Sequence, residues 1–268
     1  MIMEYVTLHN GINMPMIGFG TWDLRGKDCE RAVLDAFEVG YRLIDTAQMY
    51  RNEREVGNAI QKANIPREEL FITTKIYSPD TTYERAKKAI DKSLKELQLE
   101  YIDLLLIHEP YTTSLEMYKA IEEAYREGKL KAIGISNFNI NQYSHFIKNC
   151  EIIPMVNQVE AHIFFRQKSL QETMEKQGTI MEAWSPLAAG KKRIFESPIL
   201  IHIGQKYHKT PAQIALKYLV QNHIIVIPKS SHKERMKENL DILDFQLNRE
   251  DMEQIDKLDK NTSLFGWY

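Results

Sequence analysis

Residues 102–108 read Ile-Asp-Leu-Leu-Leu-Ile-His, a nearly continuous apolar run that ends in a histidine. The run is too short for a buried helix, and its polar and apolar residues do not alternate. Both properties are typical of a strand that is buried on both faces inside a parallel sheet. We therefore predict a buried parallel strand here, with His108 at its carboxyl end.

Seven other runs of this kind are spread along the chain. They are rich in Ile, Val, Leu and Phe and occupy residues 16–20, 41–45, 70–75, 132–136, 155–159, 179–184 and 224–228. Stretches with the apolar spacing of amphipathic helices lie between them, as at 81–97, 114–127 and 211–221. Eight strands alternating with helices predict the α/β class and a (β/α)8 TIM barrel. The alternative, an open doubly wound sheet, would favour a G-x-G-x-x-G turn after its first strand, and the sequence has none.

The segment ahead of the first predicted strand carries a turn signal. Asn10 and Gly11 stand between the runs 6–8 and 14–17, and Asn-Gly between apolar runs is a strong hairpin signal. We predict that residues 5–15 form a β-hairpin that closes the bottom of the barrel. Because no linker, internal repeat or low-complexity stretch interrupts the chain, we expect residues 1–268 to form a single domain.

The composition limits the possible function classes. With 43% hydrophobic and 27% charged residues, the chain has the make-up of a globular protein, which excludes a disordered or fibrous one. A net charge of −2 gives no strong attraction to nucleic acid or to an anionic membrane. Two cysteines, Cys29 and Cys150, cannot build a disulfide framework or a multi-cysteine zinc site. We expect a monomeric cytoplasmic protein that binds no metal, nucleic acid or membrane.

Polar side chains stand at the carboxyl ends of three neighbouring predicted strands, the end of a barrel at which active sites lie. These are Asp45 with Tyr50 five residues on, Lys75, and His108. Taken singly, each has an ordinary structural explanation, such as a helix cap for Asp45 or a solvated loop charge for Lys75. Together they would place two charges beside a buried core, which is costly unless the charges are paired.

The four residues also make chemical sense as a group. A phenol has an ordinary pKa of about 10, and a nearby ammonium such as that of Lys75 lowers it. Asp45 would pair with the ammonium, and His108 would orient a substrate oxygen by a hydrogen bond. The sequence therefore predicts a site at which Tyr50 protonates an oxygen while a second reactant attacks the attached carbon.

Several motifs of the chain are similar to those of one enzyme family. They are Gly-Phe-Gly-Thr-Trp at 18–22, Leu-Ile-Asp-Thr-Ala-Gln-Met-Tyr-Arg-Asn-Glu at 43–53, Lys75, Gly-Ile-Ser-Asn-Phe at 134–138, Asn-Gln-Val-Glu at 157–160, Trp-Ser-Pro-Leu at 184–187 and Ile-Pro-Lys-Ser at 227–230. In these motifs, their order and their separations, the sequence resembles the aldo-keto reductase family. It most resembles the short microbial members that reduce small aldehydes, methylglyoxal-like dicarbonyls and diketo-gluconate-like sugar acids.

This resemblance implies a (β/α)8 barrel that reduces aldehydes and ketones with NADPH. It implies that Tyr50 is the general acid, that Lys75 and Asp45 tune it, and that His108 positions the carbonyl. Hydride would pass from the nicotinamide to the carbonyl carbon.

The resemblance also implies contacts for the nicotinamide half of the cofactor. Trp184, where the family most often has tyrosine, would stack on the nicotinamide ring, and Ser136, Asn137 and Gln158 would hydrogen-bond its carboxamide. The remaining implied contacts are Gly20, Thr21 and Trp22 along the cofactor and the pocket wall, and Ser185 and Leu187 along the pyrophosphate.

The adenosine end is implied to lie after the eighth strand. Lys229, Ser230 and Ser231 would open a helix that carries Arg235 and Asn239, and a helix N-terminus with hydroxyls and a cation is a ready anion site. Lysine and arginine are also common as solvated helix charges. Beside the family motif they are expected to clamp the adenosine 2′-phosphate and to favour NADPH over NADH.

Two departures from the family bear on the substrate. Glu109 follows His108 where the family often has Trp or Gln, so it would line the pocket with Trp22 and repel acidic substrates, or else point away or pair with a lysine. The C-terminus is short, and Phe265 and Trp267 either wall the pocket or pack on the barrel.

Two rival functions stay open from the sequence. A barrel aldolase would use Lys75 as a Schiff base, and a non-catalytic redox sensor would bind NADPH without turnover. The four filled catalytic positions disfavour the sensor.

Overall fold

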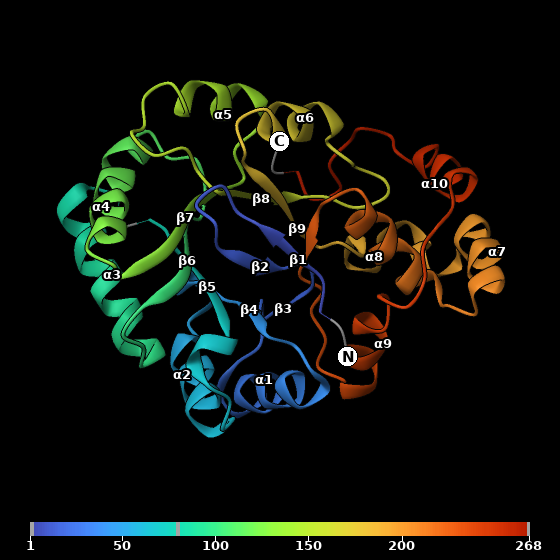
Figure 1. Cartoon of the computed structure of the whole chain (residues 1–268), viewed down its shortest axis with the longest axis horizontal. Helices are drawn as coiled ribbons and strands as arrows, with labels where there is room; N and C mark the ends of the chain where they lie inside the picture. Colours follow the sequence, from blue (N-terminus) through green and yellow to red (C-terminus); the bar gives the residue numbers. More distant parts are fainter. Residues whose placement is uncertain (1–2, 79–80, 267–268) are drawn as a thin grey trace.

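The computed structural model describes residues 3–78 and 81–266, which form an α/β fold with the strands inside and the helices outside (Figure 1). The eight parallel strands are β3 (Gly18–Gly20), β4 (Leu43–Asp45), β5 (Phe71–Ile76), β6 (Ile102–Ile107), β7 (Leu130–Ser136), β8 (Val156–Glu160), β9 (Ile180–Trp184) and β10 (Ile225–Val226). The α-helices are α1 (Gly26–Val39), α2 (Glu53–Lys62), α3 (Tyr83–Leu97), α4 (Ser114–Arg126), α5 (Ile140–Phe146), α6 (Lys168–Glu175), α7 (Pro198–Tyr207), α8 (Pro211–Gln221), α9 (Lys233–Leu240) and α10 (Arg249–Asp256). Short 3-10 turns are η1 (Gln48–Tyr50) and η2 (Arg67–Glu69), whereas η3 (Ala188–Glu196) is interrupted by non-helical backbone at 189–193.

The strands lie in the order β10-β9-β8-β7-β6-β5-β4-β3, all parallel. A parallel bridge between Ile17 and Val226 joins the two ends of this sheet. There Val226 N–H donates to Met16 O at 3.0 Å, and Gly20 N–H donates to Pro228 O at 3.2 Å. The sheet is thus a nearly closed barrel, which confirms the predicted (β/α)8 fold.

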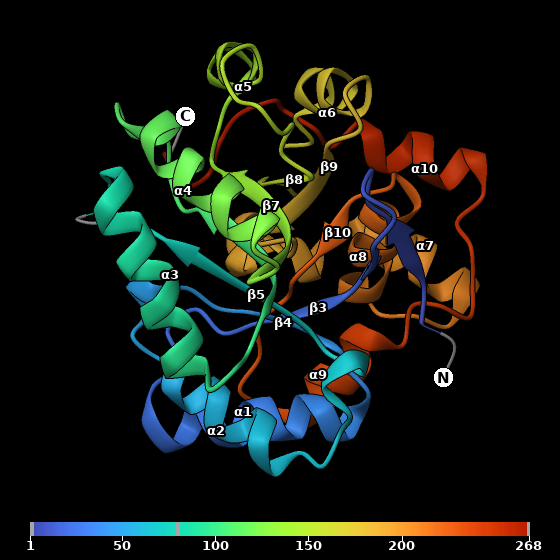
Figure 2. The same ribbon diagram turned by 60° about the vertical axis from the view of Figure 1, so that its left-hand side comes forward.

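The apolar character of the strands explains their central position. Every residue of β5 and β6 is buried, as a strand between a barrel interior and a helical layer must be. Figure 2 shows the helices packed around the outside of the strands. Gly134 on β7 is a close-packing position, because a Cβ there would come within 2.4 Å of Val156 O on the next strand.

The N-terminal hairpin consists of β1 (Tyr5–Thr7) and β2 (Asn13–Pro15), paired antiparallel. Its turn reaches the entry side of the barrel, where Asn10 Nδ2 donates to Lys131 O at 2.9 Å and the His9 imidazole contacts Ile153 O at 3.0 Å. These two partners lie at or just before the start of β7 and β8. In Figure 1 the dark blue hairpin lies across the ring of strands, which confirms the predicted closing element.

The eighth strand is shorter than its apolar run suggested. Residues 224–228 are apolar, but only Ile225 and Val226 form a ladder, and Pro228 has no N–H with which to extend it. The chain therefore leaves the sheet early and enters the loop before α9. Among the helices in the described part of the chain, none has the length and apolar character needed to cross a membrane.

Candidate active site

The carboxyl ends of β4 and β5 bring Asp45, Tyr50 and Lys75 together. The Nζ atom of Lys75 lies 2.6 Å from Asp45 Oδ1, 3.0 Å from Thr46 O and 3.3 Å from the Tyr50 hydroxyl. Lys75 is 0% exposed and Asp45 2% exposed. The sequence therefore correctly predicted that the two charges are paired against a core.

The 3-10 turn η1 delivers the phenol to this pair. Gln48, the first residue of η1, donates through Nε2 to Ala89 O and to Ser93 Oγ of α3, both at 2.8 Å. Arg51 then takes a left-handed conformation with φ of 54° and ends the turn. As a result Tyr50 is fixed at both ends, by α3 through the turn and by Lys75 at its hydroxyl.

The pKa of Tyr50 differs from the expectation. Burial raises this pKa above its ordinary value, and the Lys75 ammonium lowers it only in part. The predicted direction of the lysine's effect was right, but the expected net decrease is wrong because burial is the larger contribution. The phenol therefore keeps its proton at neutral pH, as a proton donor must.

His108 faces the same phenol. Its ring lies edge-on to that of Tyr50, with centroids 5.6 Å apart, and Trp22 packs on the phenol from another side at 4.9 Å. Burial, helped by the charge of Lys75, lowers the pKa of His108 to about 3. Its imidazole is therefore neutral and holds one N–H donor, while Nδ1 has no hydrogen-bond partner among the described residues.

A second buried carboxyl group, which the sequence analysis missed, lies in the same interior. Glu182 on β9 is 0% exposed, and its Oε2 accepts a hydrogen bond from Gln158 Nε2 at 2.8 Å. The same Nε2 also donates to Asp45 Oδ2 at 2.8 Å. Burial, with repulsion from Asp45, raises the pKa of Glu182 to about 8. The sequence does contain a pattern that could have identified Glu182, because it is an ionisable residue inside the apolar run 179–184. The same pattern identified Asp45 and Lys75.

The predicted carboxamide contacts hold neighbouring strand ends together. Asn137 Nδ2 donates to His108 O at 3.0 Å, and Asn137 Oδ1 accepts from Trp184 Nε1 at 2.8 Å. Ser136 Oγ donates to Gln158 O at 2.8 Å. These bonds connect the carboxyl ends of β6, β7, β8 and β9. The cofactor contacts predicted for these residues stay a prediction.

The residues after β3 line the other side of the mouth. Thr21 is buried and donates through Oγ1 to Asp45 O at 2.9 Å, whereas Trp22 is 52% exposed and forms part of the rim. Gly20 lies so close to β10 that a Cβ would meet Ile227 O at 2.8 Å. Close packing against the end of β10 therefore explains the glycine at position 20, independently of any cofactor contact.

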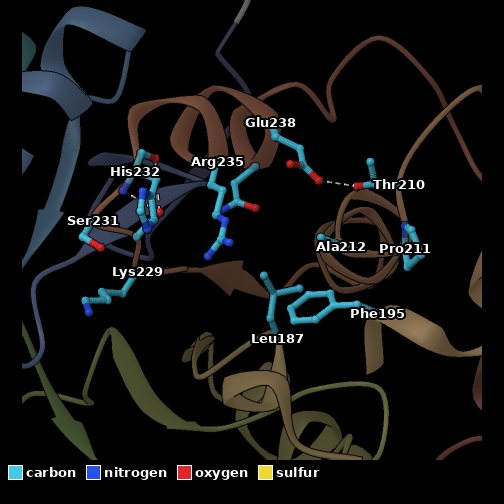
Figure 3. A pocket seen from close by; sticks show the side chains of 12 residues that line it. Leu187, Phe195, Thr210, Pro211, Ala212, Lys229, Ser231, His232, Arg235 and Glu238 are labelled. Carbon is cyan, nitrogen blue, oxygen red and sulfur yellow. Dashed lines mark hydrogen bonds between the residues drawn. The ribbon is translucent and has the colours of Figure 1, made fainter. Parts of the chain in front are cut away.

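A cavity of about 460 Å³ lies between the loop after β10, the N-terminal end of α8, and α9 (Figure 3). Arg235 points into it from α9, and Lys229 flanks it from the loop after β10. The helix itself begins at Lys233, so Lys229, Ser230 and Ser231 precede it and do not open it. The other lining residues are Leu187, Phe195, Thr210, Pro211, Ala212, His232, Glu238 and Asn239. Six of the predicted cofactor residues therefore line this cavity: Leu187, Lys229, Ser230, Ser231, Arg235 and Asn239. The two cations among them, Lys229 and Arg235, suit a phosphate-bearing ligand.

The C-terminal tail is tied to the mouth by Glu160, the last residue of β8. Its Oε2 accepts from Ser263 Oγ at 2.6 Å and its Oε1 from Leu264 N at 2.8 Å. Phe265 then packs on the ring of Trp184 at 5.3 Å. Phe265 thus does reach the mouth, and Trp267 lies outside the described residues.

Glu109 is half-buried, and burial raises the pKa of its carboxyl. The pKa of Tyr111 is raised to about 12, mainly because Tyr111 is buried. The negative charge of Glu109 adds a smaller contribution. Glu109 belongs to the segment that follows β6, next to His108. Ser185, by contrast, takes a left-handed conformation with φ of 50° where the chain leaves β9.

The raised pKa of Glu182 predicts how stability depends on pH. The folded chain holds a proton on Glu182 up to about pH 8, whereas the unfolded chain loses it near pH 4.5. Stability from this group is therefore complete below about pH 4.5 and is lost as the pH rises to about 8. Relative to Glu182→Gln, the wild type should lose up to about 1.4 kcal/mol of unfolding free energy per pH unit in this window. Urea unfolding of both proteins from pH 5 to 9 measures this, and parallel pH profiles would contradict it.

Comparison with known proteins agrees with this geometry. The Aldo/keto reductase family matches residues 16–260. The chain is 42% identical over 262 residues to glyoxal reductase of Bacillus subtilis (strain 168), an alignment that covers 97% of this chain and 94% of that protein. It superimposes with a TM-score of 0.95 and 43% identity on MGS-M4, an aldo-keto reductase enzyme from a Medee basin deep-sea metagenome library, covering 97% of each chain. A Bombyx mori aldo-keto reductase in complex with NADP gives a TM-score of 0.92 at 33% identity, with 97% of this chain and 94% of that chain covered. The chain therefore belongs to the aldo/keto reductase family and is an oxidoreductase.

Proposed function

We propose that this protein reduces small aldehydes and ketones to alcohols with NADPH, and that Tyr50 is its general acid. One observation carries the proposal: the Tyr50 hydroxyl lies 3.3 Å from the buried ammonium of Lys75, at a barrel mouth that also holds neutral His108. Residues 1–268 would act as a single domain and a monomer.

The side chains divide the work on the carbonyl oxygen. Neutral His108 donates its N–H to that oxygen and holds it beside the Tyr50 hydroxyl. Tyr50 passes its proton to the oxygen as negative charge develops there. Lys75 stabilises the phenolate that results, and Asp45 keeps the lysine charged and in place. When bound, the cofactor supplies the hydride that reaches the carbonyl carbon.

The cofactor fits the residues that the chain presents. Trp184 is partly buried at the end of β9, and its ring would stack on the nicotinamide. The cavity with Lys229 and Arg235 lies beside the loop after β10 and α9. These two cations would hold the 2′-phosphate that distinguishes NADPH from NADH. Ser136, Asn137 and Gln158 would bind the carboxamide.

The substrate is proposed to be small and uncharged. Glyoxal reductase of Bacillus subtilis is named for such a substrate, and the carboxylate of Glu109, which follows His108 in the chain, would repel anionic ones. Trp22 and Phe265 leave aromatic surface on either side of the mouth.

The pKa of Lys75 argues against the aldolase alternative. Burial would lower this pKa, but Asp45 and Tyr50 reverse the effect and hold it above its ordinary value. A Schiff base needs an unprotonated amine, which enzymes obtain by lowering the pKa of a lysine. Borohydride with a carbonyl substrate should therefore leave Lys75 unmodified.

Tyr50→Phe should abolish most of the reduction while leaving NADPH affinity nearly unchanged, because only the proton donor is removed. The loss in kcat should be about 10²- to 10⁴-fold. Steady-state kinetics with a panel of aldehydes, together with a cofactor titration, measures both quantities. A variant that keeps a kcat near the wild-type value would rule out the role of Tyr50.

Arg235→Ala should weaken the preference for NADPH, mainly by raising KM, with little effect on NADH. A hydrogen bond to a charged group contributes about 1.5–3 kcal/mol, which corresponds to roughly 10- to 150-fold in affinity. Arg249 is exposed, paired with Glu253 and absent from the cavity lining, so Arg249→Ala is a matched control. Equal efficiency of the wild type with NADH and NADPH would exclude this role for Arg235.

A further inference from the structure

Glu182 is a buried carboxyl that the proposed chemistry does not use. It lies on β9 directly beside Gln158 in the ladder between β8 and β9. Its Oε1 has no hydrogen-bond partner among the described residues, and its Oε2 accepts from the Gln158 amide. Burying a carboxyl group costs free energy unless a hydrogen bond compensates. For Glu182 the hydrogen bond from Gln158 is that compensation.

The Gln158 amide is held by two carboxyl groups at once. Its Nε2 lies 2.8 Å from Asp45 Oδ2 and 2.8 Å from Glu182 Oε2, so both of its N–H groups are used. If the amide turned over, its carbonyl oxygen would face the Asp45 carboxylate, which accepts and cannot donate. One orientation is therefore strongly favoured.

The backbone of Gln158 is fixed as well. Its carbonyl oxygen accepts from Asn137 N–H and from Ser136 Oγ, both at 2.8 Å. With the strand end and the amide nitrogen both held, only the side-chain carbonyl oxygen of Gln158 is left to meet a ligand.

We propose that Glu182 is a positioning residue that, together with Asp45, holds the Gln158 side chain so that its carbonyl oxygen accepts a hydrogen bond from the carboxamide NH2 of the nicotinamide. The inference rests on the proposed function, because it assigns a cofactor contact. Protonated Glu182 suits this task, since it accepts from Gln158 without adding a second negative charge beside Asp45.

The test compares binding of NADP+ with that of its 3-acetylpyridine analogue, in which a methyl group replaces the carboxamide nitrogen. Isothermal titration calorimetry reports binding without turnover. The wild type should prefer NADP+ by about 2- to 10-fold, the range expected of one neutral hydrogen bond. Glu182→Gln keeps an oxygen acceptor for Gln158 and should keep this preference. Glu182→Met, of similar size but with only a weak sulfur acceptor, should lose most of it.

Two further variants separate positioning from general damage. Glu122 on α4 is also buried, and its Oε1 accepts from the backbone N–H groups of Glu151 and Ile152, which precede β8 and lie outside its ladder with β9. Glu122→Gln should therefore behave like the wild type. In a Gln158→Met background, adding Glu182→Met should change the preference no further, because the glutamate acts through the glutamine. Should Glu182→Met fail to fold, Glu182→Ala carries the same comparison.

The outcomes distinguish this inference from the proposed function. A wild-type protein that binds neither NADP+ nor the analogue would overturn both. Tight NADP+ binding with the preference retained in Glu182→Met, or with a further loss in the Gln158→Met background, would overturn the role of Glu182 alone.

Discussion

An ammonium and a carboxylate lie side by side in the barrel mouth, removed from water, and the rest of the site depends on this pair. Moving each ion out of water costs several kcal/mol, and their attraction compensates only when the geometry is good and the remaining polar atoms are also satisfied. Lys75 meets that condition through Asp45, Thr46 and Tyr50. The phenol is therefore one of the groups that satisfies the buried charge.

The same constraint extends to the neighbouring strands. Asp45 has a second oxygen to satisfy, and Gln158 on β8 does so while also reaching Glu182 on β9. Two carboxyl groups and one ammonium would leave an excess negative charge in the interior, and a proton on Glu182 removes it. The pair thus determines which groups are charged across β4, β5, β8 and β9, and it keeps Lys75 protonated.

The sequence was a good guide wherever a pattern reflects burial. The eight apolar runs became the eight strands, the Asn10-Gly11 turn became the hairpin, and the charges inside the runs at 45 and 75 became the paired core of the site. It failed where the answer depends on competing free energies or on distance in space. The net rise in the Tyr50 pKa is a balance of burial against Lys75, and the bond of Glu160 to Ser263 joins residues that no local pattern connects. Glu182 carried the right signal, a carboxyl within an apolar run, yet its partner on the adjacent strand became known only from the register.

The Lys75 ammonium makes the Tyr50 phenol a stronger acid than its buried position alone would allow. The most direct measurement places a trifluorinated tyrosine at position 50, whose phenol titrates well below that of tyrosine, and follows it by 19F NMR as the pH is raised. We expect the phenol pKa in Lys75→Met to exceed that in the wild-type background by about one pH unit or more. An equal or lower pKa in the Lys75→Met protein would contradict it.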